Sequence, residues 1–123
     1  MSMIDTLNIR IASTGRIADR DGTTEDGYQY LKVKSPSSPI LIFSYRIENT
    51  GAESLDYIIL KSRDPEAAVG DFVEHATGTV LTEAIIESAD AGENFHHGAF
   101  LVGVKSSTAG TPTDATIRVL GTV

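Results

Sequence analysis

One acidic segment, Asp19–Asp26, holds the side chains best suited to bind a metal ion. It places four carboxylates within eight residues, and hard cations such as Ca²⁺ prefer carboxylate oxygens. The ligands would be Asp19, Asp21 and Glu25. A calcium loop of the helix-loop-helix type has its glycine at position six and a glutamate at position twelve. Here Gly22 stands at the fourth position and Tyr30 at the twelfth. The pattern therefore favours a solvated acidic loop with an Asp-Gly turn, acting at an interface through shape and charge, over a calcium site.

The three histidines are the second metal candidate. His96 and His97 are adjacent, and His75 would supply a third imidazole. Neighbouring residues of a strand point to opposite faces of the sheet, so two adjacent imidazoles reach one ion only across a bulge or a strand end. We therefore expect structural histidines here and no metal site.

Groups for catalysis are few. The chain has no cysteine, and it lacks the Gly-x-Ser-x-Gly pattern of a serine nucleophile elbow. Gly15, Gly22 and Gly27 are too widely spaced to form a phosphate cradle, and no spacing singles out a pair of carboxylates. We expect no catalytic residues, no cofactor and no enzymatic activity.

Composition narrows the class of protein further. A chain of 123 residues can build one core but not two, which predicts a single domain over residues 1–123. Ten basic and seventeen acidic residues give a net charge of −7, which disfavours nucleic-acid partners. No apolar run approaches the ~18 residues of a membrane span. The N-terminal residues lack the pattern of a secretory signal, so we expect synthesis in the cytoplasm.

Alternating apolar and polar residues predict strands along most of the chain. The clearest pair is Ile40–Glu48 and Leu55–Lys61, joined by Asn-Thr-Gly-Ala-Glu-Ser, which is the pattern of a β-hairpin. In the first strand one face carries Leu41, Phe43, Tyr45 and Ile47. The other face carries Ser44, Arg46 and Glu48.

Further strands are predicted at Thr6–Ser13, Tyr28–Lys34, Asp71–His75, Thr79–Glu87, Phe95–Lys105 and Asp114–Leu120, with one short helical turn at Asp64–Ala68. Thr82–Glu87 would also suit a helix ended by Gly92, but the β-branched residues and flanking glycines favour a strand. Short strands at this spacing predict an all-β fold, an antiparallel β-sandwich of immunoglobulin-like or jelly-roll type with seven or eight strands. Beyond the first face named above, the expected core consists of Leu7, Ile9, Ile11, Val102, Val104, Ile117 and Val119.

Two surface features bear on partners. The expected edge strands, Leu7–Ile11 and Ala115–Leu120, carry only Arg10 and Arg118 as charged side chains that would block pairing, which favours a homo-oligomer, a trimer or a dimer. Tyr28 and Tyr30 lie two residues apart and thus on one face. They are the one evident aromatic pair for stacking on a sugar.

The segment from Phe43 to Tyr57 resembles a hairpin of immunoglobulin-like sandwiches. It has an apolar strand, then Asn-Thr-Gly, a polar link and a second apolar strand. Further on, Ala-Asp-Ala-Gly-Glu at residues 89–93 leads into the Phe95–Lys105 strand and then into Ala-Thr-Ile-Arg-Val-Leu-Gly at residues 115–121. This half is similar to small β-sandwich virion proteins of tailed phages, including capsid decoration (cement) proteins. The likeness covers Ile40 to Val123.

The resemblance implies a structural binding protein located in the virion, with the major capsid protein or another virion protein as its partner. Alternatives are another virion component, of the tail or neck, and a non-viral carbohydrate- or protein-binding module. An enzyme would need convergent polar groups in a deep pocket.

Overall fold

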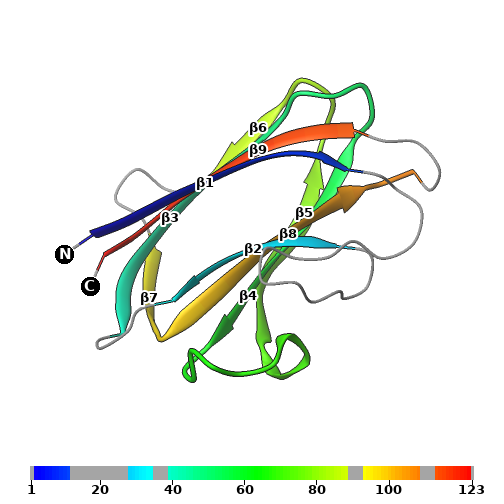
Figure 1. The fold of residues 1–123 in the computed structure, drawn as a ribbon. Helices are drawn as coiled ribbons and strands as arrows, with labels where there is room; N and C mark the ends of the chain where they lie inside the picture. Colours follow the sequence, from blue (N-terminus) through cyan, green and yellow to red (C-terminus); the bar gives the residue numbers. More distant parts are fainter. Residues whose placement is uncertain (1, 12–27, 35–38, 89–92, 109–112, 123) are drawn as a thin grey trace.

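The computed structural model describes residues 2–11, 28–34, 39–88, 93–108 and 113–122 (Figure 1). This part of the chain forms nine strands: β1 (Ser2–Ile11), β2 (Gln29–Lys34), β3 (Ile40–Asn49), β4 (Leu55–Ser62), β5 (Val73–Val80), β6 (Ile85–Glu87), β7 (Glu93–His97), β8 (Ala99–Ser106) and β9 (Thr113–Thr122). One 3₁₀ turn, Val69–Asp71, precedes β5. No helix in the described part is long and apolar enough to cross a membrane.

The strands form two antiparallel sheets packed face to face (Figure 1). One has the order β1-β9-β3-β6, with β7 also on β3, and the other the order β2-β8-β4-β5. The pairs β1·β9, β2·β8, β3·β6/β7 and β4·β5 are nested one inside the next, as in one long hairpin wound around a barrel axis. This nesting is the jelly-roll arrangement, so the predicted all-β antiparallel sandwich is confirmed and the jelly-roll alternative describes its topology.

The predicted hairpin at residues 40–61 is wrong. Both segments are strands, but β3 belongs to the five-stranded sheet and β4 to the four-stranded sheet. The link of residues 50–54 is therefore an arch that crosses from one sheet to the other. Local alternation shows that a segment is a strand and which face is apolar, but not which strand it pairs with.

The predicted single strand Phe95–Lys105 is also two strands. The chain bends at Gly98, and β7 pairs with β3 while β8 lies between β2 and β4. Gly98 is required at this corner, because a Cβ there would lie 2.6 Å from the carbonyl oxygen of Arg63. The amide of Gly98 donates to the carbonyl of Ser62 at 3.0 Å, which ties the corner to the end of β4.

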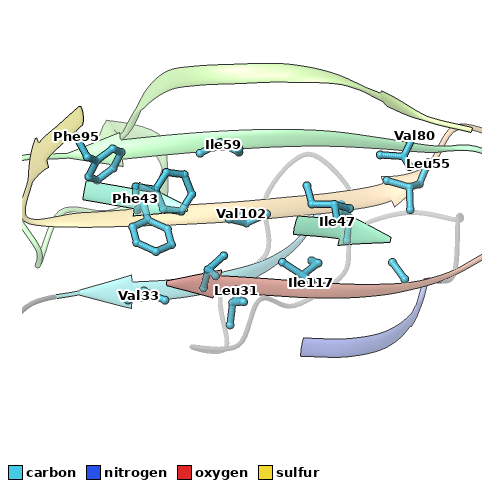
Figure 2. Packing of buried hydrophobic residues seen from close by; sticks show 14 of the residues in the cluster. Leu31, Val33, Phe43, Ile47, Leu55, Ile59, Val80, Phe95, Val102 and Ile117 are labelled. Atoms are coloured by element: carbon cyan, nitrogen blue, oxygen red, sulfur yellow. The ribbon is translucent and has the colours of Figure 1, made fainter. Parts of the chain in front are cut away.

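The core fills the space between the sheets (Figure 2). Alternation correctly predicted the buried positions of the central strands, which include Phe43, Ile47, Val102, Val104, Ile117 and Val119. Tyr45 is partly buried against this core. The side chains of Leu7, Ile9 and Ile11 lie outside the described part, although the register sets Leu7 opposite Ile117 and Ile9 opposite Ala115.

Leu41 is a wrong prediction, since its side chain is 40% exposed. The ladder between β3 and β7 shifts register between Ile40 and Ile42, and such an irregularity reorients side chains. As a result Ile40 and Phe43 are fully buried, while Leu41 and Ile42 both face outward.

A second apolar cluster covers part of the outer face of the four-stranded sheet. It consists of Tyr30, Leu60, Phe72, Ala99 and Leu101. Phe72 ends the segment that follows β4, where the Asp64 carboxylate accepts from the amide of Glu66 at 2.9 Å and closes a turn. In place of the predicted helical turn there is this turn followed by the 3₁₀ turn. Because the core covers one face of β8 and this second cluster covers the other, β8 is buried on both faces. It thereby holds the centre of its sheet in place.

Of the two predicted edge strands, only the first is an edge. β1 is an edge of the five-stranded sheet, but β9 lies between β1 and β3. The end of the chain is thus paired on both sides, and Ser2 lies opposite Thr122. Nested winding places the last strand inside the sheet, which alternation along the chain does not reveal.

Candidate functional site

Two arginines face each other on the outer surface of the five-stranded sheet. Arg46 of β3 and Arg118 of β9 are direct cross-strand partners, and Glu87 of β6 lies opposite Arg46 on the other side. Residues directly opposite in a ladder share one face, so these three side chains form a row across three strands. We call Arg118, Arg46 and Glu87 the arginine row.

The two arginines of this row differ in their ion pairs. Arg46 lies 3.4 Å from the Glu48 carboxylate and 3.8 Å from that of Glu87. Arg118 is exposed, and no ion pair joins it to a carboxylate among the described side chains. Like charges directly opposite each other destabilise a sheet. The facing of Arg46 and Arg118 is therefore not explained by the stability of the sheet, and within the described side chains no carboxylate offsets the charge of Arg118.

The chemistry of the row follows from the guanidinium groups. Each presents donors in a planar fork that matches a carboxylate or phosphate with two parallel hydrogen bonds. Strands in a sheet are about 4.7–4.9 Å apart, so two facing guanidinium groups can contact one acidic segment. In a chain of net charge −7, this local basic pair is matched in charge and geometry to carboxylate or phosphate groups.

The outer face of the four-stranded sheet carries a different row of polar groups. Lys105 lies over the Tyr28 ring at 4.4 Å from its centroid, and Asp56 is the cross-strand partner of both Lys105 and Thr79. The Asp56 carboxylate accepts from the hydroxyls of Ser107 at 2.7 Å and Thr79 at 3.2 Å. These contacts already engage the groups with one another, so this row is held together internally.

The aromatic pair expected on this face is only partly at the surface. Tyr28 and Tyr30 do share a face, with ring centroids 6.0 Å apart. Tyr30 is only 2% exposed, because its ring lies over Gly103, where a Cβ would meet it at 2.6 Å. A two-ring platform for sugars is therefore absent from this face.

The histidines are brought together around an aromatic ring. His75 of β5 and His97 of β7 contact Phe95 at centroid distances of 5.6 and 5.2 Å. His75 reaches it from a bulge, since Ile59 pairs with Ala76 but Leu60 pairs with Glu74. The Nδ1 atom of His97 lies within hydrogen-bond distance of the Phe95 carbonyl. These two histidines thus pack at one end of the core, consistent with the structural role expected of them.

The side chains of the other candidate metal ligands lie outside the described part of the structure. Asp19, Asp21 and Glu25, together with the rest of the acidic loop, lie outside the described residues, as does the side chain of His96. Within the described residues no three histidine or carboxylate side chains are grouped so that they could hold a metal ion.

The sequence predicted that Arg46 faces outward and that Arg118 is a charge on an edge strand, but not that the two are cross-strand partners. Both lie at outward positions of alternating strands, and that signal was available. Their contact depends on the pairing of β3 with β9, which no local pattern encodes.

No family model and no curated protein matches the chain. Solved structures do. The chain is similar to the crystal structure of PirA, with a TM-score of 0.53 and 12% identity, over 95% of this chain and 93% of that one. It is also similar to the Yersinia pseudotuberculosis-derived mitogen, with a TM-score of 0.56 and 10% identity, over 97% of this chain and 86% of that one. At these identities the likeness is one of fold. It covers 95–97% of this chain and agrees with an all-β sandwich.

Proposed function

We propose that this chain is a non-enzymatic structural binding protein, and specifically a capsid decoration protein of a tailed phage that docks through the arginine row. The single observation that carries the binding role is the facing pair Arg46 and Arg118 on an outer sheet surface. Facing like charges that destabilise a sheet and do not contact the core are expected where a partner supplies the opposite charge.

The fold supports this role. A jelly roll with its core closed between two sheets is a stiff module, and the same architecture serves in viral capsid and lectin domains. A cement protein needs such stiffness, because it reinforces a shell by repeated weak contacts rather than by chemistry. The major capsid protein is the proposed partner, with an acidic segment opposite Arg118.

A tail or neck position is a variant of the same proposal. A non-viral sugar-binding module is the alternative class, and the burial of Tyr30 leaves it only Tyr28 as a stacking surface. A protein-binding module outside a virion would use the arginine row in the same way, so only the identity of the partner separates it from the leading proposal.

Mass spectrometry of purified virions from a lysate of the encoding phage tests the placement. We expect the chain in the particles, and co-sedimentation of the purified protein with capsids that lack it. The binding should weaken as salt is added, because exposed charges are screened. If the chain is absent from virions and does not bind capsids, the decoration role is wrong.

A charge reversal tests the docking face. Arg118→Glu should weaken capsid binding about tenfold or more, by replacing attraction with repulsion at the interface. Arg63→Glu is the matched control, since Arg63 is also exposed but lies in the turn after β4. Equal effects of the two substitutions would show that net charge matters and the arginine row does not.

A further inference from the structure

The sheet edges of the described strands differ in how well they are protected against pairing. The five-stranded sheet ends at β1 on one side and at β6 and β7 on the other, and the four-stranded sheet ends at β2 and β5. Proteins protect such edges with charges, lysines, bulges or short strands. β1 carries Asp5 and Arg10, and β2 carries Lys32 and Lys34. β6 and β7 are only three and five residues long.

β5 is the least protected of these edges. Its bulge at His75 and its one carboxylate, Glu74, lie near its start. From Ala76 to Thr82 the sequence Ala-Thr-Gly-Thr-Val-Leu-Thr holds no charged side chain. After the bulge the ladder with β4 is regular from Ala76 to Val80, so the backbone of this segment has the extended geometry that a further strand requires. The Val80 carbonyl at its end already accepts from the Asn49 side chain at 3.2 Å, so the groups open to a partner are those of Ala76–Thr79.

Two exposed apolar side chains follow this edge in the sequence, one directly after β5 and one in β6 of the other sheet. Leu81, directly after β5, is 67% exposed, and Ile85, at the start of β6, is 43% exposed. The two stand at the ends of one tight turn, in which the amide of Ala84 donates to the carbonyl of Leu81 at 3.0 Å. Glu83 in this turn has φ 61°, a left-handed conformation that non-glycine residues seldom adopt. The turn thus carries the chain from β5 to β6 of the other sheet and holds Leu81 next to the end of the open edge.

We propose that Ala76–Val80, with Leu81, is the site at which a second copy of this chain pairs in an antiparallel fashion. A two-fold axis through the edge satisfies the backbone groups of both strands with one and the same segment. It would join the two four-stranded sheets into one continuous sheet and remove Leu81 from water.

Charge favours a second copy at this segment rather than elsewhere. Each chain has a net charge of −7, so two copies repel each other over most of their surfaces. The stretch from Ala76 to Thr82 is the neutral part of an edge, and its small side chains let two backbones approach. The proposal concerns self-association alone and does not depend on the decoration role.

Analytical ultracentrifugation of the full chain, from low micromolar to several hundred micromolar concentration, tests the proposal. We expect a reversible dimer, and we expect Leu81→Glu to weaken the dimer about tenfold or more. Val73→Glu is the matched control. Val73 is 57% exposed on the same strand, but it lies before the bulge.

Hydrogen exchange gives an independent readout. The amides of the Ala76–Val80 segment should gain protection as the protein concentration rises, and should lose that gain in the Leu81→Glu variant. A chain that stays monomeric throughout the concentration range overturns the proposal. So does a dimer that Leu81→Glu leaves intact, or one that Val73→Glu weakens to the same extent.

Discussion

The Thr113 hydroxyl lies 3.1 Å from the side-chain oxygen of Asn49, and these two buried polar groups are 64 residues apart in the chain. The same hydroxyl is 2.9 Å from the Glu53 carbonyl, so its one proton serves either acceptor. The Asn49 amide nitrogen donates to the carbonyls of Glu53 at 2.7 Å and Val80 at 3.2 Å. Its oxygen also accepts from the amide of Gly51 at 3.0 Å. Asn49 therefore connects the arch after β3 to the end of β5 and the start of β9.

Asn49→Ala should lower the free energy of unfolding by about 3 kcal/mol or more, because it leaves several buried polar groups without a partner. Chemical denaturation monitored by circular dichroism measures the loss. Thr50→Ala is the control. Thr50 is exposed, and its backbone amide donates to the Asp114 carbonyl at 2.9 Å. Alanine keeps this bond, so the replacement should change stability by less than about 0.5 kcal/mol. Similar losses in both variants would contradict the role given to the Asn49 side chain.

Phe43→Ala should destabilise the protein by about 3–5 kcal/mol, the cost of a large-to-small change in a filled core. The Phe43 ring contacts Phe100, Phe95 and Tyr45 with centroids 4.2, 5.2 and 5.4 Å apart. Leu41→Ala, two residues away and mostly outside the core, should cost less than about 1 kcal/mol. Equilibrium unfolding of the two variants decides between them, and the reverse ranking would mean that β3 presents its other face to the core.

Gly51→Ala should cost about 2 kcal/mol or more, because an added methyl group cannot fit without moving backbone. A Cβ at this position would lie 2.3 Å from the backbone nitrogen of Asp114. Gly70→Ala is the comparison, since nothing lies within 4 Å of a Cβ there. Thermal unfolding should show a clear drop in Tm for the first variant and little change for the second. A tolerated alanine at residue 51 would show that the arch and β9 are not in close contact.

Calcium should leave the melting temperature nearly unchanged. The carboxylates of Asp19, Asp21 and Glu25 do not follow the spacing of a calcium loop, and a ligand stabilises a protein only if it binds the folded form. Thermal scans with increasing Ca²⁺, and with Mg²⁺ as the control, measure this. A rise of several degrees that saturates with Ca²⁺ alone would establish a calcium site in this loop.

The sequence by itself determined where most strands form and which side chains of the central strands face inward. The predicted strand Thr79–Glu87 is wrong, since this segment is the end of β5, a turn at residues 81–84 and β6. In β9 the alternation of Ala115, Ile117 and Val119 with polar residues was enough to place all three in the core. This works because the two-residue period of a strand is local, and burial of one face follows from it. The length of the chain likewise predicts one domain.

Only the tertiary structure decided which strands pair. β3 and β4 are neighbours in sequence but lie in different sheets, since the pairing of strands depends on contacts made across the whole chain. On a smaller scale, the tertiary structure also decided the register shifts at Ile40–Ile42 and at the His75 bulge. The facing of Arg46 and Arg118, the edge at β5 and the contact of Asn49 with Thr113 all arise from the winding of the nested strand pairs. Because each joins residues far apart in the chain, no pattern within a single strand could predict it.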